Sequence, residues 1–138
     1  MTDLPVKDVR IAVAMVIRDG NLLLLERRDA NPMWDHKWEF PGGKIEEGEH
    51  PENAMRREVI EETGLEVIDA EFLGLHLHKW YLPDRILQVY LHCFRCGAGE
   101  GDIVREERGS YSHVWTKPQD ALAFDLLEAN ADLIRKFL

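Results

Sequence analysis

The chain has 138 residues, of which 45% are hydrophobic and 31% are charged, and its formal net charge is −9. This length suffices for one domain with a buried core, and we expect a single domain over residues 1–138. The 26 Asp and Glu outnumber the 17 Lys and Arg, which argues against a nucleic-acid polymer as the main partner. No signal-peptide pattern occurs, and no apolar run approaches the roughly 20 residues of a membrane span, so we expect a cytoplasmic protein without a membrane partner.

The first half of the chain predicts a β-hairpin followed by a helix. Two apolar runs between Val9 and Arg28 are joined by Asp19-Gly20-Asn21, a typical hairpin turn. A helix is predicted over residues 51–63, because Pro51 suits the first helical turn and Gly64 suits a left-handed C-cap.

The second half predicts further strands and a terminal helix. The expected elements are strands over residues 67–82, 86–96 and 111–116, a short helix after Pro118 and a C-terminal helix from about Leu126. Strands that flank a helix, followed by more strands and a last helix, predict an α/β fold. Its mixed sheet should be covered on both faces.

The predicted helix over residues 51–63 carries an acidic face. Glu58, Glu61 and Glu62 lie three and four residues apart, so they share one side of the helix. Carboxylates this close repel each other unless a cation binds them. Oxygen ligands that leave room for water and phosphate suit Mg²⁺, with Mn²⁺ as a substitute. Arg57 cannot bind a metal but can clamp a carboxylate, and Glu61 is one within helical reach. A solvated acidic face is the alternative.

The loop before this helix has the composition of a phosphate-binding loop. Residues 38–44 read WEFPGGK, and the adjacent Gly42 and Gly43 let the backbone approach a ligand closely. Lys44 places a mobile positive charge beside the acidic cluster, where a phosphate needs one. Directly upstream of an acidic helix, this loop is expected to contact both phosphate and metal.

Cysteine and histidine spacing gives no second site. Cys93 and Cys96 form C-x-x-C in a strand-like run, where residues three apart point to opposite faces. Reduced thiols are therefore expected in place of a shared metal or redox pair. His76 and His78 can share a strand face, and we expect a satisfied or exposed pair there in preference to a metal site.

The loop and helix together match one long motif. Residues 43–65 read GKIEEGEHPENAMRREVIEETGL, which fits G-x5-E-x7-R-E-U-x-E-E-x-G-U with U apolar. This pattern resembles the signature of the Nudix hydrolases, which cleave nucleoside diphosphates linked to a further group. The run EFPGGKIE is similar to the MutT-like branch, whose members hydrolyse nucleoside triphosphates. The resemblance covers nearly the whole chain and implies an α/β/α sandwich with a mixed β-sheet.

The resemblance also implies roles for residues of the motif. Glu58 and Glu62 would hold the cation, Glu61 would ligate a second one, and the Gly42 carbonyl would be a further ligand. Glu49 is implied as a secondary ligand or structural acid. The backbone implied to line the nucleotide pocket belongs to Glu39, Phe40, Pro41 and Gly42.

Family members often add a glutamate from the loop before a late strand that ends near a tryptophan. By resemblance this residue is Glu107, favoured over Glu106, and Trp115 is the tryptophan. A solvated pair of acids is the alternative. The general base would be Glu58, Glu61 or Glu107, since coupled carboxylates around a metal share their titration.

Contacts to the base and phosphates are expected from several further residues. The run Leu127–Asn130 resembles the MutT-like segment that supplies an asparagine, and the Asn130 amide offers both a donor and an acceptor to a base. A surface asparagine is the alternative. Arg27, Arg28 and Arg85 are candidates for phosphate or base contacts, or else charges at strand ends.

The expected reaction is Mg²⁺-dependent hydrolysis of a nucleoside triphosphate, including an oxidised or non-standard one, to the monophosphate and pyrophosphate. A second interpretation is cleavage of ADP-ribose or a dinucleoside polyphosphate, because Tyr81 and Pro83 lie where such members often carry a telltale tyrosine or proline. A third is a nucleotide-binding module without catalysis, which the intact glutamate set disfavours. We expect a monomer or a homodimer.

Overall fold

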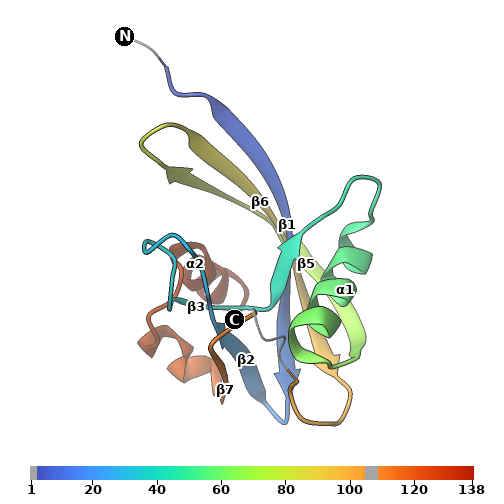
Figure 1. Cartoon of the computed structure of the whole chain (residues 1–138). Helices are drawn as coiled ribbons and strands as arrows, with labels where there is room; N and C mark the ends of the chain where they lie inside the picture. Colours follow the sequence, from blue (N-terminus) through green and yellow to red (C-terminus); the bar gives the residue numbers. More distant parts are fainter. Residues whose placement is uncertain (1–2, 105–108) are drawn as a thin grey trace.

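Strand β1 (Val6–Arg18) is the centre of the fold, because both of its edges are paired (Figure 1). The computed structural model describes residues 3–104 and 109–138. Within these residues the sheet order is β3-β2-β1-β6-β5, with β4 on β1 and β7 on β2. The strands after β1 are β2 (Asn21–Glu26), β3 (Trp38–Glu39), β4 (Gly42–Lys44), β5 (Val67–Tyr81), β6 (Ile86–Ala98) and β7 (Ser112–Thr116). The helices are α1 (Pro51–Thr63), the 3₁₀ helix η1 (Pro118–Ala123) and α2 (Glu128–Phe137).

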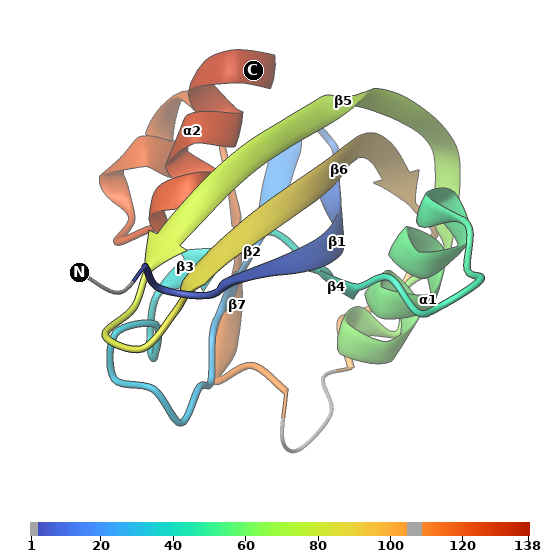
Figure 2. The same ribbon diagram turned by 90° about the horizontal axis from the view of Figure 1, so that it is seen from above.

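The sheet is mixed and carries one α-helix on each face, as the view in Figure 2 shows. Strand β1 runs parallel to β6 and antiparallel to β2 and β4. Alternate β1 residues face opposite ways: Ala12 and Ala14 pack in the core under α1, whereas Val13 and Met15 pack in the core under α2. The predicted α/β/α sandwich is confirmed.

The predicted hairpin forms, but its ladder is short. Asp19 and Gly20 both have positive φ, as a tight hairpin turn requires, yet β1 and β2 pair only at Ile17–Leu22 and Arg18–Asn21. Below the turn, β4 occupies the edge of β1 from Ile11 to Val13. Strand β2 therefore diverges and pairs with β3 and β7.

Helix α1 begins and ends where the sequence predicts. Pro51 occupies its first turn, the His50 ring accepts a hydrogen bond from the Glu52 N–H, and Gly64 forms the C-cap with φ of 74°. Ala54, Met55 and Val59 are buried against the sheet. Because this face of α1 is buried, Glu58 and Glu62 beside it point toward strand β4.

The C-terminal helix begins two residues later than predicted. Leu126 forms a bridge with Trp38, and the Leu127 N–H donates to the Trp38 carbonyl at 3.0 Å. This backbone pairing keeps residues 126–127 extended, so α2 starts at Glu128. The pairing also attaches the start of α2 to the loop that contains Phe40.

Cys93 and Cys96 are buried free thiols in different cores, on opposite faces of β6. Burial raises the pKa of Cys93 to about 12 and that of Cys96 to about 11. The expectation of two inert, reduced thiols fits this placement. Among the described residues no helix is long and apolar enough to cross a membrane.

Candidate active site

Arg57 on α1 organises the acidic cluster. Its Nε and Nη2 donate to the two carboxylate oxygens of Glu49 at 2.9 and 3.0 Å, and its Nη1 donates to Glu58 at 2.9 Å. Glu61 lies farther away, at 3.3 Å from the same Nη1. The sequence placed Glu61 within reach of Arg57 but missed the bidentate pair with Glu49. That pair holds the pKa of Glu49 at about 2 and fixes the loop to the helix.

The two glycines of β4 are required by close packing on either side. A Cβ atom at Gly43 would overlap the Glu58 carboxylate, and one at Gly42 would overlap the Ala12 carbonyl oxygen. Only glycine therefore lets the strand lie against both β1 and α1. The Glu58 carboxylate is consequently in contact with the β4 backbone at Gly43.

Glu58 and Glu62 form a close pair of partly buried carboxyl groups. Burial is the main cause that raises the pKa of both groups. For Glu58 the hydrogen bonds from Arg57 and Glu62 oppose the rise, and the charge of Glu61 adds to it. For Glu62 the effect is large, because Glu39 and Glu58 add to burial while the Gly42 N–H, which donates to its carboxylate, opposes them. Two carboxyl groups in this position are stable either sharing a proton or holding a cation. Hard oxygen donors of this kind fit a divalent ion such as Mg²⁺.

Two cavities lie side by side, and Glu62 lines the smaller of them. The larger is about 360 Å³, and most of the expected pocket residues line it, namely Glu39, Phe40, Gly42, Lys44, Arg85 and Asn130. The smaller is about 260 Å³ and is lined by Glu62 and Arg28, among others. Arg27, Glu39 and Gly42 line both. The cavities are therefore neighbouring parts of one region that extends from Asn130 to Glu62.

Arg27 and Glu39 form the partition between the two cavities. The Arg27 Nη1 donates to both Glu39 oxygens at 3.0 Å, and its Nε donates to Asp29 at 2.8 Å. Burial raises the pKa of Glu39, and the guanidinium opposes that rise. The charge of Arg27 is thus balanced by two carboxylates, so its structural role is to position Glu39. This pairing was not predicted from the sequence.

Asn130 is in the larger cavity and also holds its wall. Its Oδ1 accepts the Phe40 N–H at 2.9 Å, so the amide donors are the groups that remain for a ligand. Trp34 and Trp80 line the same cavity, with their ring centroids 5.6 Å apart in an edge-to-face arrangement. Neither residue was predicted from the sequence to belong to the site. An aromatic wall beside an amide is suited to a nucleobase.

The remaining predicted residues occupy varied positions. Pro41 is fully buried, and its carbonyl accepts the Ala14 N–H at 2.9 Å, so it contributes support under the cavity. The Arg28 guanidinium lies 4.4 Å from the centre of the Tyr111 ring, and Arg85 pairs with Asp84 at 2.9 Å. Trp115 lies in β7. Glu106 and Glu107 lie outside the described residues.

Comparison with known proteins supplies the decisive observation. The model of the NUDIX domain family matches residues 8–137. The chain is a member of the Nudix hydrolase family. It is 30% identical to the CTP pyrophosphohydrolase of Escherichia coli (strain K12), over 96% of this chain and 93% of that protein. It is 39% identical to the 8-oxo-dGTP diphosphatase of the same organism, over 54% of this chain and 64% of that protein.

A solved structure has the same fold. The MutT NUDIX hydrolase of Burkholderia pseudomallei superposes with a TM-score of 0.80 at 24% identity, covering 96% of this chain and 99% of that one. At this identity the likeness shows the fold. The Nudix hydrolase is thus a pyrophosphohydrolase of nucleotide substrates, in a family that uses divalent metal ions.

Proposed function

We propose that this Nudix hydrolase is a cytoplasmic, Mg²⁺-dependent nucleoside triphosphate pyrophosphohydrolase that releases a monophosphate and pyrophosphate, with Mn²⁺ able to replace Mg²⁺. The observation that supports it is the adjacency of the two cavities. One is lined by aromatic and amide groups suited to a base, and the other by Glu62. A nucleotide with its base beside Asn130 has its phosphates directed toward the carboxylates.

The residues of the chain have separable tasks in this reaction. Glu58 and Glu62 would hold the cation, with the Gly42 carbonyl as a further ligand, and Glu61 would ligate a second cation. Arg57 is a positioning residue, since it fixes the Glu58 carboxylate at 2.9 Å. Lys44, in the wall of the larger cavity, faces the phosphates.

When bound, Mg²⁺ supplies charge neutralisation for the phosphates and lowers the pKa of water. A glutamate accepts the proton of the attacking water, and the candidates are Glu58, Glu61 and Glu107. Water adds at phosphorus as the bond between the first and second phosphates breaks. The oxygen that was bridging leaves with one of the two products.

A nucleotide panel with products resolved by chromatography tests the proposal. With Mg²⁺ present, we expect a triphosphate to yield its monophosphate and pyrophosphate, and chelation of the metal to stop the reaction. Faster cleavage of ADP-ribose or a dinucleoside polyphosphate than of any triphosphate would overturn the substrate assignment. Tyr81, which suggested those substrates, is 70% exposed and is not among the residues that line the larger cavity.

A further inference from the structure

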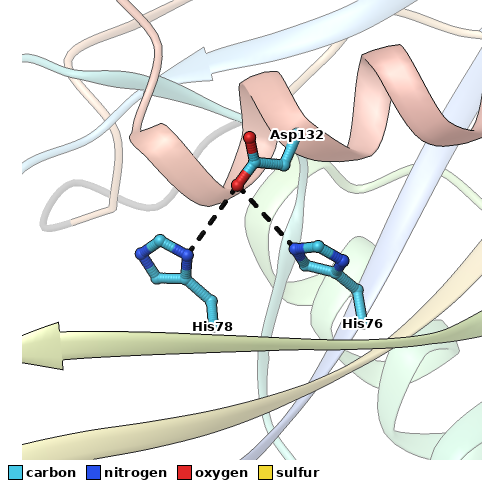
Figure 3. A group of neighbouring side chains, drawn as sticks. All are labelled: His76, His78 and Asp132. Carbon is cyan, nitrogen blue, oxygen red and sulfur yellow. Dashed lines mark ion pairs between the residues drawn. The ribbon is translucent and has the colours of Figure 1, made fainter.

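Three side chains with metal-binding chemistry meet where α2 packs on β5, away from the Nudix glutamates (Figure 3). His76 and His78 alternate along β5, so both rings point to the same face of the sheet. Asp132 is on α2, which covers that face. The sequence shows the two histidines together, but Asp132 lies more than fifty residues downstream and is brought to them only by the fold.

The distances in this group leave a gap between the ligand atoms. The Asp132 Oδ2 lies 3.8 Å from the His76 Nε2 and 3.9 Å from the His78 Nδ1. Both distances are too long for hydrogen bonds. One ligand atom from each residue lies within 4.8 Å of the other two. Ligand atoms around a tetrahedral zinc ion are about 3.3 Å apart, so modest side-chain movement would close the set around an ion.

The two rings are also poorly satisfied without an ion. The Nε2 atoms of His76 and His78 are buried and have no hydrogen-bond partner among the described residues. The His78 side chain is only 10% exposed, and its ring packs edge-to-face on Trp80 at 4.7 Å. A buried imidazole nitrogen without a partner costs free energy, and an ion bound to the His76 Nε2 would remove that cost for one ring.

We propose that His76, His78 and Asp132 bind one first-row transition metal ion, for which Zn²⁺ is the best match, and that the ion fastens α2 to β5. Two imidazole nitrogens and one carboxylate suit zinc and not magnesium, which prefers oxygen ligands. Asp132 is 39% exposed, so the fourth position is open to water.

Two positive charges oppose a cation at this place, and neither blocks it. Arg135 lies 3.7 Å from the Asp132 Oδ1, which leaves Oδ2 directed at the histidines. Lys136 acts on His76 electrostatically, but its side chain is exposed and solvent screens its charge. Neither cation competes for the nitrogen atoms.

The proposed ion would act on the base pocket through α2. Asn130, which holds the Phe40 backbone, is two residues before Asp132 on the same helix. Trp80, packed on His78, lines the larger cavity. This site is separate from the catalytic cation and does not depend on which nucleotide is hydrolysed.

Zinc binding to the whole protein tests the proposal by calorimetry and thermal unfolding, with millimolar Mg²⁺ present to occupy the Nudix glutamates. We expect one zinc ion per chain at micromolar affinity or better, and a zinc-dependent rise in Tm. His76→Gln and His78→Gln should each weaken binding more than about 100-fold, beyond the usual loss from an outer-shell partner. Co²⁺ should give the visible absorption of nitrogen and oxygen coordination in the wild type and lose it in both variants.

His92→Gln is the matched control, because His92 lies on β6 with its side chain on the opposite face of the sheet. This variant should bind zinc as the wild type does. Asp132→Asn tests the same site from the partly exposed helix residue, and it should weaken zinc binding even if a strand variant folds poorly. Zinc binding of equal affinity in wild type and Asp132→Asn would overturn the proposal, as would a wild type with no zinc-dependent Tm shift. Activity in Mg²⁺ alone is the readout for the catalytic proposal, so either can fail without the other.

Discussion

Glu62 is the residue at which burial and function conflict most directly. Its carboxyl is partly buried beside Glu39 and Glu58, and this raises its pKa well above the ordinary value of 4.5. In this position Glu62 also lines the smaller cavity, where we propose that a cation binds. Under the proposed function, the cation would offset the cost of ionising this carboxyl group.

Glu62→Gln should lower kcat by about 10²- to 10³-fold on every nucleotide, because it removes one ligand charge at nearly constant volume. Steady-state kinetics at saturating Mg²⁺ measure this loss. Glu47→Gln is the control, since Glu47 is an exposed acid of the same motif. Turnover near that of the wild type in the Glu62 variant would exclude it as a metal ligand.

The raised pKa of Glu62 also predicts how the metal-free protein responds to pH. The folded state keeps the proton to higher pH than the unfolded state, so stability should be greatest below the ordinary pKa of 4.5 and should fall as pH rises through the raised pKa of the folded state. Glu62→Gln should flatten this slope, and saturating Mg²⁺ should also flatten it because the cation replaces the proton. Urea unfolding at several pH values is the measurement. A slope that is identical in wild type and variant would contradict the assignment.

At the scale of elements, the start of α2 and the β3–β4 loop act as one unit. The Phe40 N–H donates to Asn130, and Trp38 pairs with residues 125–127. Asn130 therefore has two possible roles, contact with the base and support of the loop. Substitutions that separate its acceptor from its donors can distinguish them.

Asn130→Ala removes both the acceptor and the donors, whereas Asn130→Asp keeps an oxygen for Phe40 and loses only the donors. If the amide contacts the base, both variants should raise KM on the preferred nucleotide, with a loss of binding free energy of about 1–3 kcal/mol. Base preference should become weaker, and kcat on a poor substrate should stay almost unchanged. The nucleotide panel measures this. Wild-type base preference in Asn130→Asp, with a defect in Asn130→Ala, would leave only the supporting role.

The elements that sequence predicted well are those with local signals. Helix α1 is marked by Pro51 and Gly64 at its ends, and the turn after β1 by Asp19 and Gly20. The close spacing of the motif glutamates likewise placed the acidic cluster on α1, although the metal role of each residue stays a prediction.

Contacts between distant segments could not be read in the same way. Two ion pairs, that of Arg57 with Glu49 and that of Arg27 with Glu39, depend on how loops return to the sheet. A charged residue in a sequence has many possible partners at similar cost, and only the three-dimensional path selects one. The proximity of Asp132 to the two histidines of β5 could not be predicted from the sequence for the same reason.

At the scale of the molecule, the sheet separates two layers to which the proposed function gives different tasks. Met55 on α1 and Leu133 on α2 are both fully buried, on opposite faces. Met55 supports the helix that carries the glutamates, whereas Leu133 supports the helix that carries Asn130. The two cores should therefore affect different kinetic constants.

Met55→Ala and Leu133→Ala should each cost about 2–5 kcal/mol of stability, as expected for large-to-small core changes. Under conditions where both variants stay folded, Leu133→Ala should mainly raise KM, and Met55→Ala should mainly lower kcat. Denaturant unfolding and steady-state kinetics check the two parts. Equal losses of kcat in both variants would contradict a division of tasks between the layers.

The backbone from Glu39 to Gly42 has a consequence for which bond is cut. It is fixed between the base pocket and the carboxylates, by Asn130 at Phe40 and by Ala14 at Pro41. Because this backbone keeps the base pocket and the carboxylates at a constant distance, a single phosphorus atom should lie beside the attacking water. Hydrolysis should therefore be regiospecific. In H₂¹⁸O, all of the label should enter one product, either the monophosphate or the pyrophosphate. Mass spectrometry that finds label in both would mean that the nucleotide slides along this wall.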